Sequence, residues 1–372
     1  MSEVVLFEEL SCSNGKKIAV ATLNAERSLN ALSHDMVKQL YPQLSIWQKD
    51  RNIAAVFLQG AGEKAFCAGG DIVHLYNNLP EKNGDPAPGI EEFFRDEYQL
   101  DYLIHTFDKP FIVWGNGIVM GGGLGLMAGG SHRIVTETTR IAMPEISIGL
   151  YPDVGGSYFL NKMPGNSGLF LGLTGASINA ADAKYTHLAD HFINNDKKLA
   201  LLDELLTVNW GDTIALNHQK LSSLIVGFEQ RSIANAPISN VQHHQSLITE
   251  LTNGDNLTSI VDNILTFETE DKWLSRAKTS LAHGSPISAM LTYRQLQESA
   301  NLSLLECFRL ELGVSTKCGE FGEFKEGVRA LLIEKDNNPQ WKYNSVSDVE
   351  ANVIDWFFTS PWTKTEHPLA SL

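Results

Sequence analysis

The hydrophobic period of the chain changes near Ser157, and this change limits the fold more than any other feature. Before it, short apolar segments alternate with stretches of helical spacing, and after it long amphipathic stretches leave little room for strands. The predicted strands are residues 4–8, 17–23, 53–58, 111–114 and 133–137. The predicted helices are residues 31–47, 92–106, 122–129, 197–209, 218–230, 246–252, 286–300 and 303–317. The pattern indicates an α/β protein with a mostly helical second part.

The 372 residues suffice for one large domain with an appendage or for two domains. Polar and turn-forming residues gather between Ser232 and His244, which favours a boundary there. We therefore expect a core over residues 1–231 and a helical region over residues 232–372 that packs on it.

The composition argues against several classes of function. The formal net charge of −15 disfavours nucleic acid as a partner, because phosphate binding relies on clustered Lys and Arg. No apolar run approaches the roughly 18 residues that a membrane span needs. The cysteines have no zinc-ligand spacing, so we expect neither a metal site nor a disulfide framework. Residues 1–9 are acidic where a signal or transit peptide would be basic, which predicts a cytoplasmic protein.

Two glycine-rich turns, residues 65–71 and 117–125, each follow a predicted strand. Glycine lets backbone N–H groups approach a ligand closely, and such donors stabilise the negative oxygen that forms when an acyl carbonyl reacts. Removing one donor of this kind typically costs ~3–4 kcal/mol of transition-state stabilisation. Either turn alone is more often a tight turn or a close packing site. The presence of both favours acyl chemistry.

The second turn also fits a dinucleotide fingerprint, Gly123-x-Gly125-x-x-Ala128, with Glu145 as the ribose-binding acid. A fingerprint loop follows its strand directly, whereas here residues 115–120 lie between the predicted strand and the glycines. Glu145 also follows Pro144 and precedes a second acid and more glycines. We therefore place this interpretation behind acyl chemistry.

The segment of residues 143–156 carries Glu145 and Asp153 with almost no other charge. Two acids in an apolar pocket should titrate apart, so that one is ionised as base or nucleophile and the other suits hydrogen-bond donation. The alternatives are that Asp153 caps a helix and that Glu145 pairs with Arg140. Other catalytic signatures, such as Gly-x-Ser-x-Gly and His-Glu-x-x-His, are absent from the sequence. These two carboxylates are therefore the best acid–base candidates.

Together these motifs resemble the crotonase, or enoyl-CoA hydratase/isomerase, superfamily, and within it the 3-hydroxyisobutyryl-CoA hydrolase group. The resemblance covers nearly the whole chain. It rests on residues 27–32, 64–72, the glycines 121–123, residues 145–156, and residues 324–336 with Pro339 and Trp341.

The resemblance implies a core of repeated β-β-α turns, a helical C-terminal part over it, and a coenzyme A thioester held largely by backbone groups. By motif position, the N–H groups of Gly70 and Gly122 should form the oxyanion hole, and Ala68 and Asp71 should contact coenzyme A. The remaining candidate contacts, for the phosphates, are Arg27 and Lys64, although exposed loop cations more often face solvent. We expect no cofactor beyond the substrate's coenzyme A. Trimers or hexamers occur among such relatives, and a monomer also fits.

Position 125 separates two reactions within this resemblance. Enoyl-CoA hydratases carry a second acid there, whereas this chain has Gly125, and the hydrolase group instead has acids matching Glu145 and Asp153. We expect hydrolysis of a short branched 3-hydroxyacyl-CoA such as 3-hydroxyisobutyryl-CoA, in valine breakdown, with a hydratase or isomerase as the alternative. Glu145 would activate water or attack the carbonyl directly. Asp153 would bind the 3-hydroxyl or shuttle a proton.

Overall fold

The computed structural model describes residues 3–372, and its chain divides into two compact units. Unit 1 contains the chain up to Gly70, Leu100–Ile141 and Ile178–Ser239. Unit 2 contains Asp71–Gln99, Ala142–Ser177 and Asn240–Leu372. The chain passes between the units several times, so neither unit is one continuous stretch. The boundary predicted at residues 231 and 232 stays a prediction.

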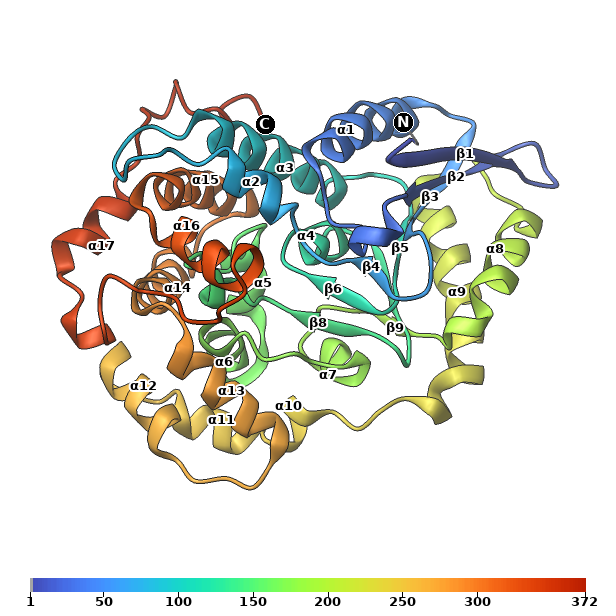
Figure 1. The fold of residues 1–372 in the computed structure, drawn as a ribbon. Coiled ribbons are helices and arrows are strands. Elements are labelled where there is room, and N and C mark those ends of the chain that lie inside the picture. The colour runs from blue at the N-terminus through green and yellow to red at the C-terminus, as the bar shows by residue number, and fades with distance from the viewer. Residues whose placement is uncertain (1–2) are drawn as a thin grey trace. The chain divides into compact units, whose positions relative to one another are not determined.

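Unit 1 is built on a six-stranded sheet in the order β1-β2-β3-β5-β7-β9 (Figure 1). Its strands are β1 (Val5–Ser11), β2 (Lys17–Leu23), β3 (Ile53–Gly60), β5 (Phe111–Gly115), β7 (His132–Val135) and β9 (His191–Phe192). The pair β1 and β2 is antiparallel, and the other neighbours are parallel. Strands β3 and β5 are almost entirely buried, as parallel strands covered on both faces usually are.

A second sheet has the order β4-β6-β8, with β4 (Ala65–Cys67), β6 (Ile118–Met120) and β8 (Arg140–Ala142). Such short strands give no readable period, and none of them was predicted. Strand β6 corrects the sequence interpretation, because it lies directly before the glycines at 121–123 where a gap was expected. The distance between a strand and the glycines therefore no longer argues against a dinucleotide fingerprint.

Unit 1 has five α-helices among the described residues: α1 (His34–Lys49), α4 (Gly122–Ala128), α7 (Ala180–Tyr185), α8 (Lys198–Thr207) and α9 (Ile214–Ser232). Helix α4 contacts β4 and β6, and the others contact the larger sheet. Helix α1 begins later than predicted because the side chain of Ser33 accepts a hydrogen bond from Met36 N–H and caps it. Helices α8 and α9 pack beside the sheet (Figure 1), and Leu201, Leu221 and Phe228 join its buried core.

Unit 2 is helical. Among the described residues after Ser157 the one strand is β9, which confirms the predicted change to mostly helical structure. The helices of unit 2 are α2 (Ile72–Asn77), α5 (Gly156–Phe159), α6 (Ser167–Thr174), α10 (Asn240–His243), α11 (Gln245–Leu251), α12 (Leu257–Thr266), α13 (Lys272–His283), α14 (Pro286–Ser299), α15 (Leu304–Phe321), α16 (Glu323–Val328) and α17 (Ala351–Phe358). Helix α3 (Pro88–His105) contributes its first part, up to Gln99, to this unit. Among residues 3–372, no helix has the length and apolar character to cross a bilayer.

Two glycines let α16 lie directly against η2 (Glu145–Ile148), the 3-10 turn that carries Glu145. A side chain at Gly149 would place its Cβ 2.4 Å from the carbonyl oxygen of Glu323. A side chain at Gly327 would meet the backbone of Ile148 at 2.4 Å. Both positions therefore require glycine, and the C-terminal helices fix the segment that carries the acids.

Candidate active site

The segment with the predicted acids has an unusual backbone. Gly149 ends η2 at a φ of 70°, and Val154 and Gly155 have φ of 52° and 87°. Positive φ at a β-branched residue such as Val154 is strained by roughly 1–3 kcal/mol and persists only where surrounding contacts enforce it. Helix α15 supplies such contacts. The carboxylate of Glu311 accepts hydrogen bonds from Gly155 N–H at 2.8 Å and Ser157 N–H at 2.9 Å.

Both predicted acids are buried, with Glu145 5% and Asp153 3% exposed. Burial raises the pKa of Glu145 well above its ordinary value, and the neighbouring charge of Asp153 raises it further. Burial also raises the pKa of Asp153, to about 6, against a hydrogen bond from Tyr98 that lowers it. The two carboxyls therefore act on each other in a poorly solvated place, as expected for acid–base work.

The predicted alternative role of Asp153 as a helix cap is wrong. Gly155 is the N-cap of α5, and the Asp153 side chain instead takes a hydrogen bond from Tyr98. The pair of Glu145 with Arg140 would join residues of different units and stays untested.

A third acid, Glu97 of α3, was not among the residues predicted from the sequence. It is 2% exposed, and burial together with the charges of Asp153 and Glu145 raises its pKa well above the ordinary value. Within the described residues, Glu97 Oε1 and Glu145 Oε2 have no hydrogen-bond partner. Buried carboxyl oxygens without donors are costly, so this cluster suits a substrate that supplies polar groups.

The sequence did contain a signal for Glu97. It follows Phe93 by four residues and Phe94 by three, so helical spacing places it on the apolar face of α3. Both phenylalanines are buried. An acid on the buried face of a helix is rare without a function or a partner.

Hydroxyl groups of Tyr98, Ser315 and Tyr151, which we call the hydroxyl network, connect Asp153 to α15. Tyr98 Oη lies 2.6 Å from Asp153 Oδ2 and 2.8 Å from Ser315 Oγ. Ser315 Oγ also lies 2.8 Å from Tyr151 Oη, which donates to the carbonyl oxygen of Glu311 at 2.7 Å. Side chains from three parts of the chain therefore fix one oxygen of Asp153.

The predicted oxyanion donors lie in the two glycine turns of unit 1. The turns pack directly on each other, because a Cβ at Gly123 would lie 2.3 Å from the carbonyl oxygen of Cys67. Gly121 has a φ of 46° and caps α4. Gly121 and Gly123 thus have conformational and packing reasons to be glycine. Gly122 is the first residue of α4, and the role of the Gly70 and Gly122 N–H groups as donors to a carbonyl oxygen stays a prediction.

The residues predicted to contact coenzyme A differ in their exposure and in their hydrogen bonds. Arg27 and Lys64 are exposed, and Ala68 is half-buried. Asp71 caps α2 by accepting a hydrogen bond from His74 N–H at 3.1 Å. These roles in binding coenzyme A stay predictions.

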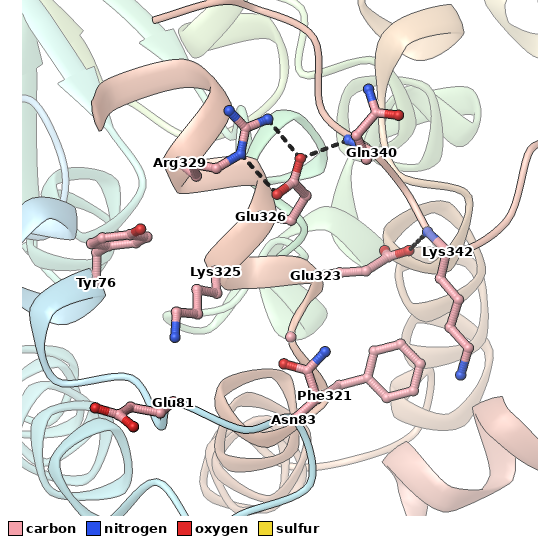
Figure 2. A pocket seen from close by; sticks show the side chains of 11 residues that line it. Tyr76, Glu81, Asn83, Phe321, Glu323, Lys325, Glu326, Arg329, Gln340 and Lys342 are labelled. Atoms are coloured by element: carbon pink, nitrogen blue, oxygen red, sulfur yellow. Dashed lines mark hydrogen bonds and ion pairs between the residues drawn. The ribbon is translucent and has the colours of Figure 1, made fainter. Parts of the chain in front are cut away.

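A pocket of about 410 Å³ lies in unit 2 beside α16 (Figure 2). The lining side chains include Tyr76, Glu81, Lys325 and Lys342, and Lys325 donates a hydrogen bond to the carbonyl oxygen of Pro80. Arg329 also lines it, but its guanidinium is already bound to Glu326, as Figure 2 shows. The two lysines therefore supply its available positive charge.

Curated relatives share most of the chain. A protein from Danio rerio named mitochondrial 3-hydroxyisobutyryl-CoA hydrolase is 40% identical over 96% of this chain and 89% of that protein. The Homo sapiens protein of the same name is 35% identical with the same coverage of each. The predicted cytoplasmic location is contradicted by these relatives, which are named as mitochondrial. The acidic character of residues 1–9 was weak evidence for a location, because it rests on a few residues, whereas the similarity to these relatives extends over most of the chain.

Solved structures share the fold. A carnitinyl-CoA dehydratase from Mycobacterium thermoresistibile is 31% identical with a TM-score of 0.85, covering 100% of both chains. An enoyl-CoA hydratase from Rhodobacter sphaeroides 2.4.1 is 29% identical with a TM-score of 0.82, covering 96% of this chain and 98% of its own. These likenesses confirm the predicted fold, a crotonase-like core with a helical C-terminal part.

A family model described as enoyl-CoA hydratase/isomerase matches residues 18–358, a span that contains both glycine turns and the acids Glu97, Glu145 and Asp153. The chain therefore belongs to the enoyl-CoA hydratase/isomerase family.

Proposed function

We propose that the protein hydrolyses 3-hydroxyisobutyryl-CoA to 3-hydroxyisobutyrate and free coenzyme A. The observation that carries this function is the buried pair Glu145 and Asp153, on a chain 40% identical to a relative named for that reaction. This hydrolysis would be a step in valine breakdown, which the family resemblance implies.

The chemistry starts at the thioester carbonyl. The N–H groups of Gly70 and Gly122 would bind its oxygen and stabilise the charge that develops there. Glu145, whose Oε2 has no partner among the described residues, would take a proton from water or attack the carbonyl carbon itself. Both routes need an ionised Glu145. Asp153 and Glu97 would supply polar partners for the 3-hydroxyl group.

A hydratase or isomerase on the same scaffold is the alternative, since two of the similar structures are of a hydratase and a dehydratase. Position 125 argues against it, because Gly125 lies inside the buried helix α4 and brings no carboxyl group. Addition of water across a double bond by two glutamates therefore lacks the carboxyl group expected at position 125.

A panel of acyl-CoA thioesters with a thiol-reactive dye tests the proposal. We expect 3-hydroxyisobutyryl-CoA to release free coenzyme A fastest, other small 3-hydroxyacyl thioesters more slowly, and plain acyl thioesters least. Loss of the enoyl absorbance without release of thiol would instead support the hydratase.

The contacts with the nucleotide end of coenzyme A can be assigned in the same assay. We propose Arg27 and Lys64 for the phosphates, with Ala68 and Asp71 as further contacts to coenzyme A. The pocket of Figure 2 offers Lys325 as another candidate for a phosphate. A lysine that binds a phosphate should raise KM for the coenzyme A thioester by roughly tenfold when changed to alanine, because a charged hydrogen bond is lost. The same change should leave KM for the pantetheine thioester, which lacks the nucleotide, unaltered. Lys197→Ala on the surface of unit 1 is the matched control.

A further inference from the structure

We propose that Glu311 and Gln295 are positioning residues that hold the backbone on both sides of Asp153, so that recognition of the substrate's 3-hydroxyl group depends on helices α14 and α15. The inference rests on the proposed function, in which Asp153 would bind that hydroxyl group. It adds the residues that set the selectivity without touching the substrate.

The carboxyl group of Glu311 on α15 holds the chain after Asp153. Its Oε2 accepts a hydrogen bond from Gly155 N–H at 2.8 Å. Its Oε1 accepts from Ser157 N–H at 2.9 Å and from the Ser157 hydroxyl at 2.5 Å. Three donors therefore meet two acceptor oxygens. A side-chain amide cannot replace this carboxyl group, because its NH₂ group would face one of the backbone N–H groups.

The side chain of Gln295 on α14 holds the chain before Asp153. Its Nε2 donates a hydrogen bond to the carbonyl oxygen of Pro152 at 2.7 Å. Ser299, one turn later on the same helix, donates to the carbonyl oxygen of Ser157 at 3.1 Å. Asp153 therefore lies between two backbone positions that side chains of α14 and α15 hold in place.

The backbone between these positions is in a conformation that needs such support. Val154 and Gly155 have φ of 52° and 87°. A β-branched residue rarely adopts a positive φ, and surrounding contacts must enforce it. If Val154 relaxed to a negative φ, the preceding Asp153 would change its direction relative to the residues that follow. The hydrogen bonds of Glu311 and Gln295 therefore control where the carboxyl group of Asp153 points.

Both positioning side chains are unfavourable to bury. Glu311 is 1% exposed, and burial raises its pKa to about 8 against the hydrogen bonds that lower it. Gln295 is 0% exposed, and its Oε1 has no hydrogen-bond partner among the described residues. An apolar side chain at either position would avoid these costs. The contacts with residues 152–157 are what the polar groups add.

A fixed Asp153 favours a substrate whose hydroxyl group lies where that carboxyl group is held. Groups that are positioned before binding lose little entropy when the substrate binds, and a displacement of ~1 Å can cost up to about 10²-fold in rate. A plain acyl chain has no 3-hydroxyl group and gains nothing from this arrangement. Loss of Glu311 or Gln295 should therefore affect hydroxyacyl thioesters selectively.

The ratio of kcat/KM for 3-hydroxyisobutyryl-CoA to that for isobutyryl-CoA, measured as thiol release, tests the proposal. Glu311→Gln replaces one acceptor by a donor at the same size, and Gln295→Met removes the donor to Pro152 at similar size. Each should lower the ratio by roughly tenfold, because a misplaced Asp153 loses its hydrogen bond to the hydroxyl group. Ser157→Ala, which removes one of three donors to Glu311, should lower it less.

Two matched controls separate positioning from damage to packing. Asp182→Asn makes the same carboxyl-to-amide change at a buried site of unit 1, where Asp182 accepts from Asn179 N–H at 3.0 Å and from the Ser239 hydroxyl at 2.7 Å. It should lower the thermal midpoint and leave the ratio unchanged. Gln297→Met, at an exposed position of α14, should change neither.

The proposal would be overturned if Glu311→Gln and Gln295→Met, shown to be folded by their thermal midpoints, lowered kcat/KM equally for both thioesters. An unchanged ratio in these two variants would also overturn it.

A double-mutant cycle with Asp153 gives a second readout. If Glu311 acts through Asp153, Glu311→Gln should lower the ratio no further in a protein that already carries Asp153→Asn. Additive losses would show that Glu311 acts independently of Asp153 and would contradict the inference. A failure of the proposed function has a different signature, because the unchanged protein would then release no thiol from 3-hydroxyisobutyryl-CoA.

Discussion

The glycine turns of unit 1 and the buried acids of unit 2 differ in how the chain builds them. In unit 1, the donors are backbone N–H groups in glycine turns, where neighbours such as Gly121 and Gly123 are fixed by φ and by packing on Cys67. In unit 2, the acids are side chains whose burial depends on helices far away in sequence. Backbone donors therefore follow from local sequence, whereas the protonation of the acids depends on long-range packing.

The largest expected effect lies on the acid side. Glu145→Gln keeps the shape of the side chain but removes the base or nucleophile, so thiol release should fall by roughly 10³-fold or more. The thermal midpoint should not fall, because a buried acid that lacks a partner is removed. Binding of free coenzyme A serves as the control. If this variant released thiol at the original rate, the acid side would not be the reacting side.

A smaller loss is expected at the acid that sequence reasoning missed. Glu97→Gln should reduce kcat/KM for the 3-hydroxyacyl thioester by roughly tenfold, since the carboxyl group that would hydrogen-bond the substrate's hydroxyl is replaced by an amide. Plain acyl thioesters should be affected less. Steady-state kinetics on the two substrate types provide the measurement, and an equal effect on both would assign Glu97 a structural role.

Substitution in the glycine turns should lower the stability of the protein. Gly123→Ala places a Cβ 2.3 Å from the carbonyl of Cys67, which we expect to lower the free energy of unfolding by about 1–3 kcal/mol. Gly227→Ala in α9 is the matched control, because nothing lies within 4 Å of its added Cβ. It should be neutral or stabilising by about 1 kcal/mol, since alanine favours helix. Denaturant titration compares the two.

The smallest expected effect is the pH dependence of stability. The pKa of Asp153 is raised to about 6 and that of Glu311 to about 8, so the folded protein binds more protons than the unfolded chain. Their stabilising contribution is complete below the ordinary carboxyl pKa of about 4 and is lost as pH rises through those values.

The thermal midpoint should therefore fall by a few degrees between about pH 5 and pH 8. Glu311→Gln should reduce that fall, because one of the titrating groups is gone. A midpoint that rises over this range would contradict the raised pKa values.

The sequence predicted much of the fold and supplied some of the candidate site residues, for physical reasons that differ from one element to the next. Long periodic segments such as β3, α14 and α15 were found because their apolar spacing repeats over several turns or pairs. Strands β4, β6 and β8 were missed because they are three residues long. Their pairing comes from distant segments.

Within the site, Glu145, Asp153, Gly70 and Gly122 were identified from motifs. Glu97 and the hydroxyl network were not, because their proximity to Asp153 is created by the packing of α3 and α15 against residues 143–156. Tyr98 and Ser315 are 217 residues apart, and nothing local relates them.

The position at which oxygen-18 from labelled water enters the product tests the central claim most directly. The protein would be incubated with 3-hydroxyisobutyryl-CoA and, in parallel, with the matching enoyl-CoA in heavy-oxygen water, and the products analysed by mass spectrometry. We predict a heavy oxygen in the carboxylate of 3-hydroxyisobutyrate together with an equal amount of free coenzyme A. A heavy oxygen in a new hydroxyl group on an intact thioester, with no free coenzyme A, would contradict hydrolysis by Glu145.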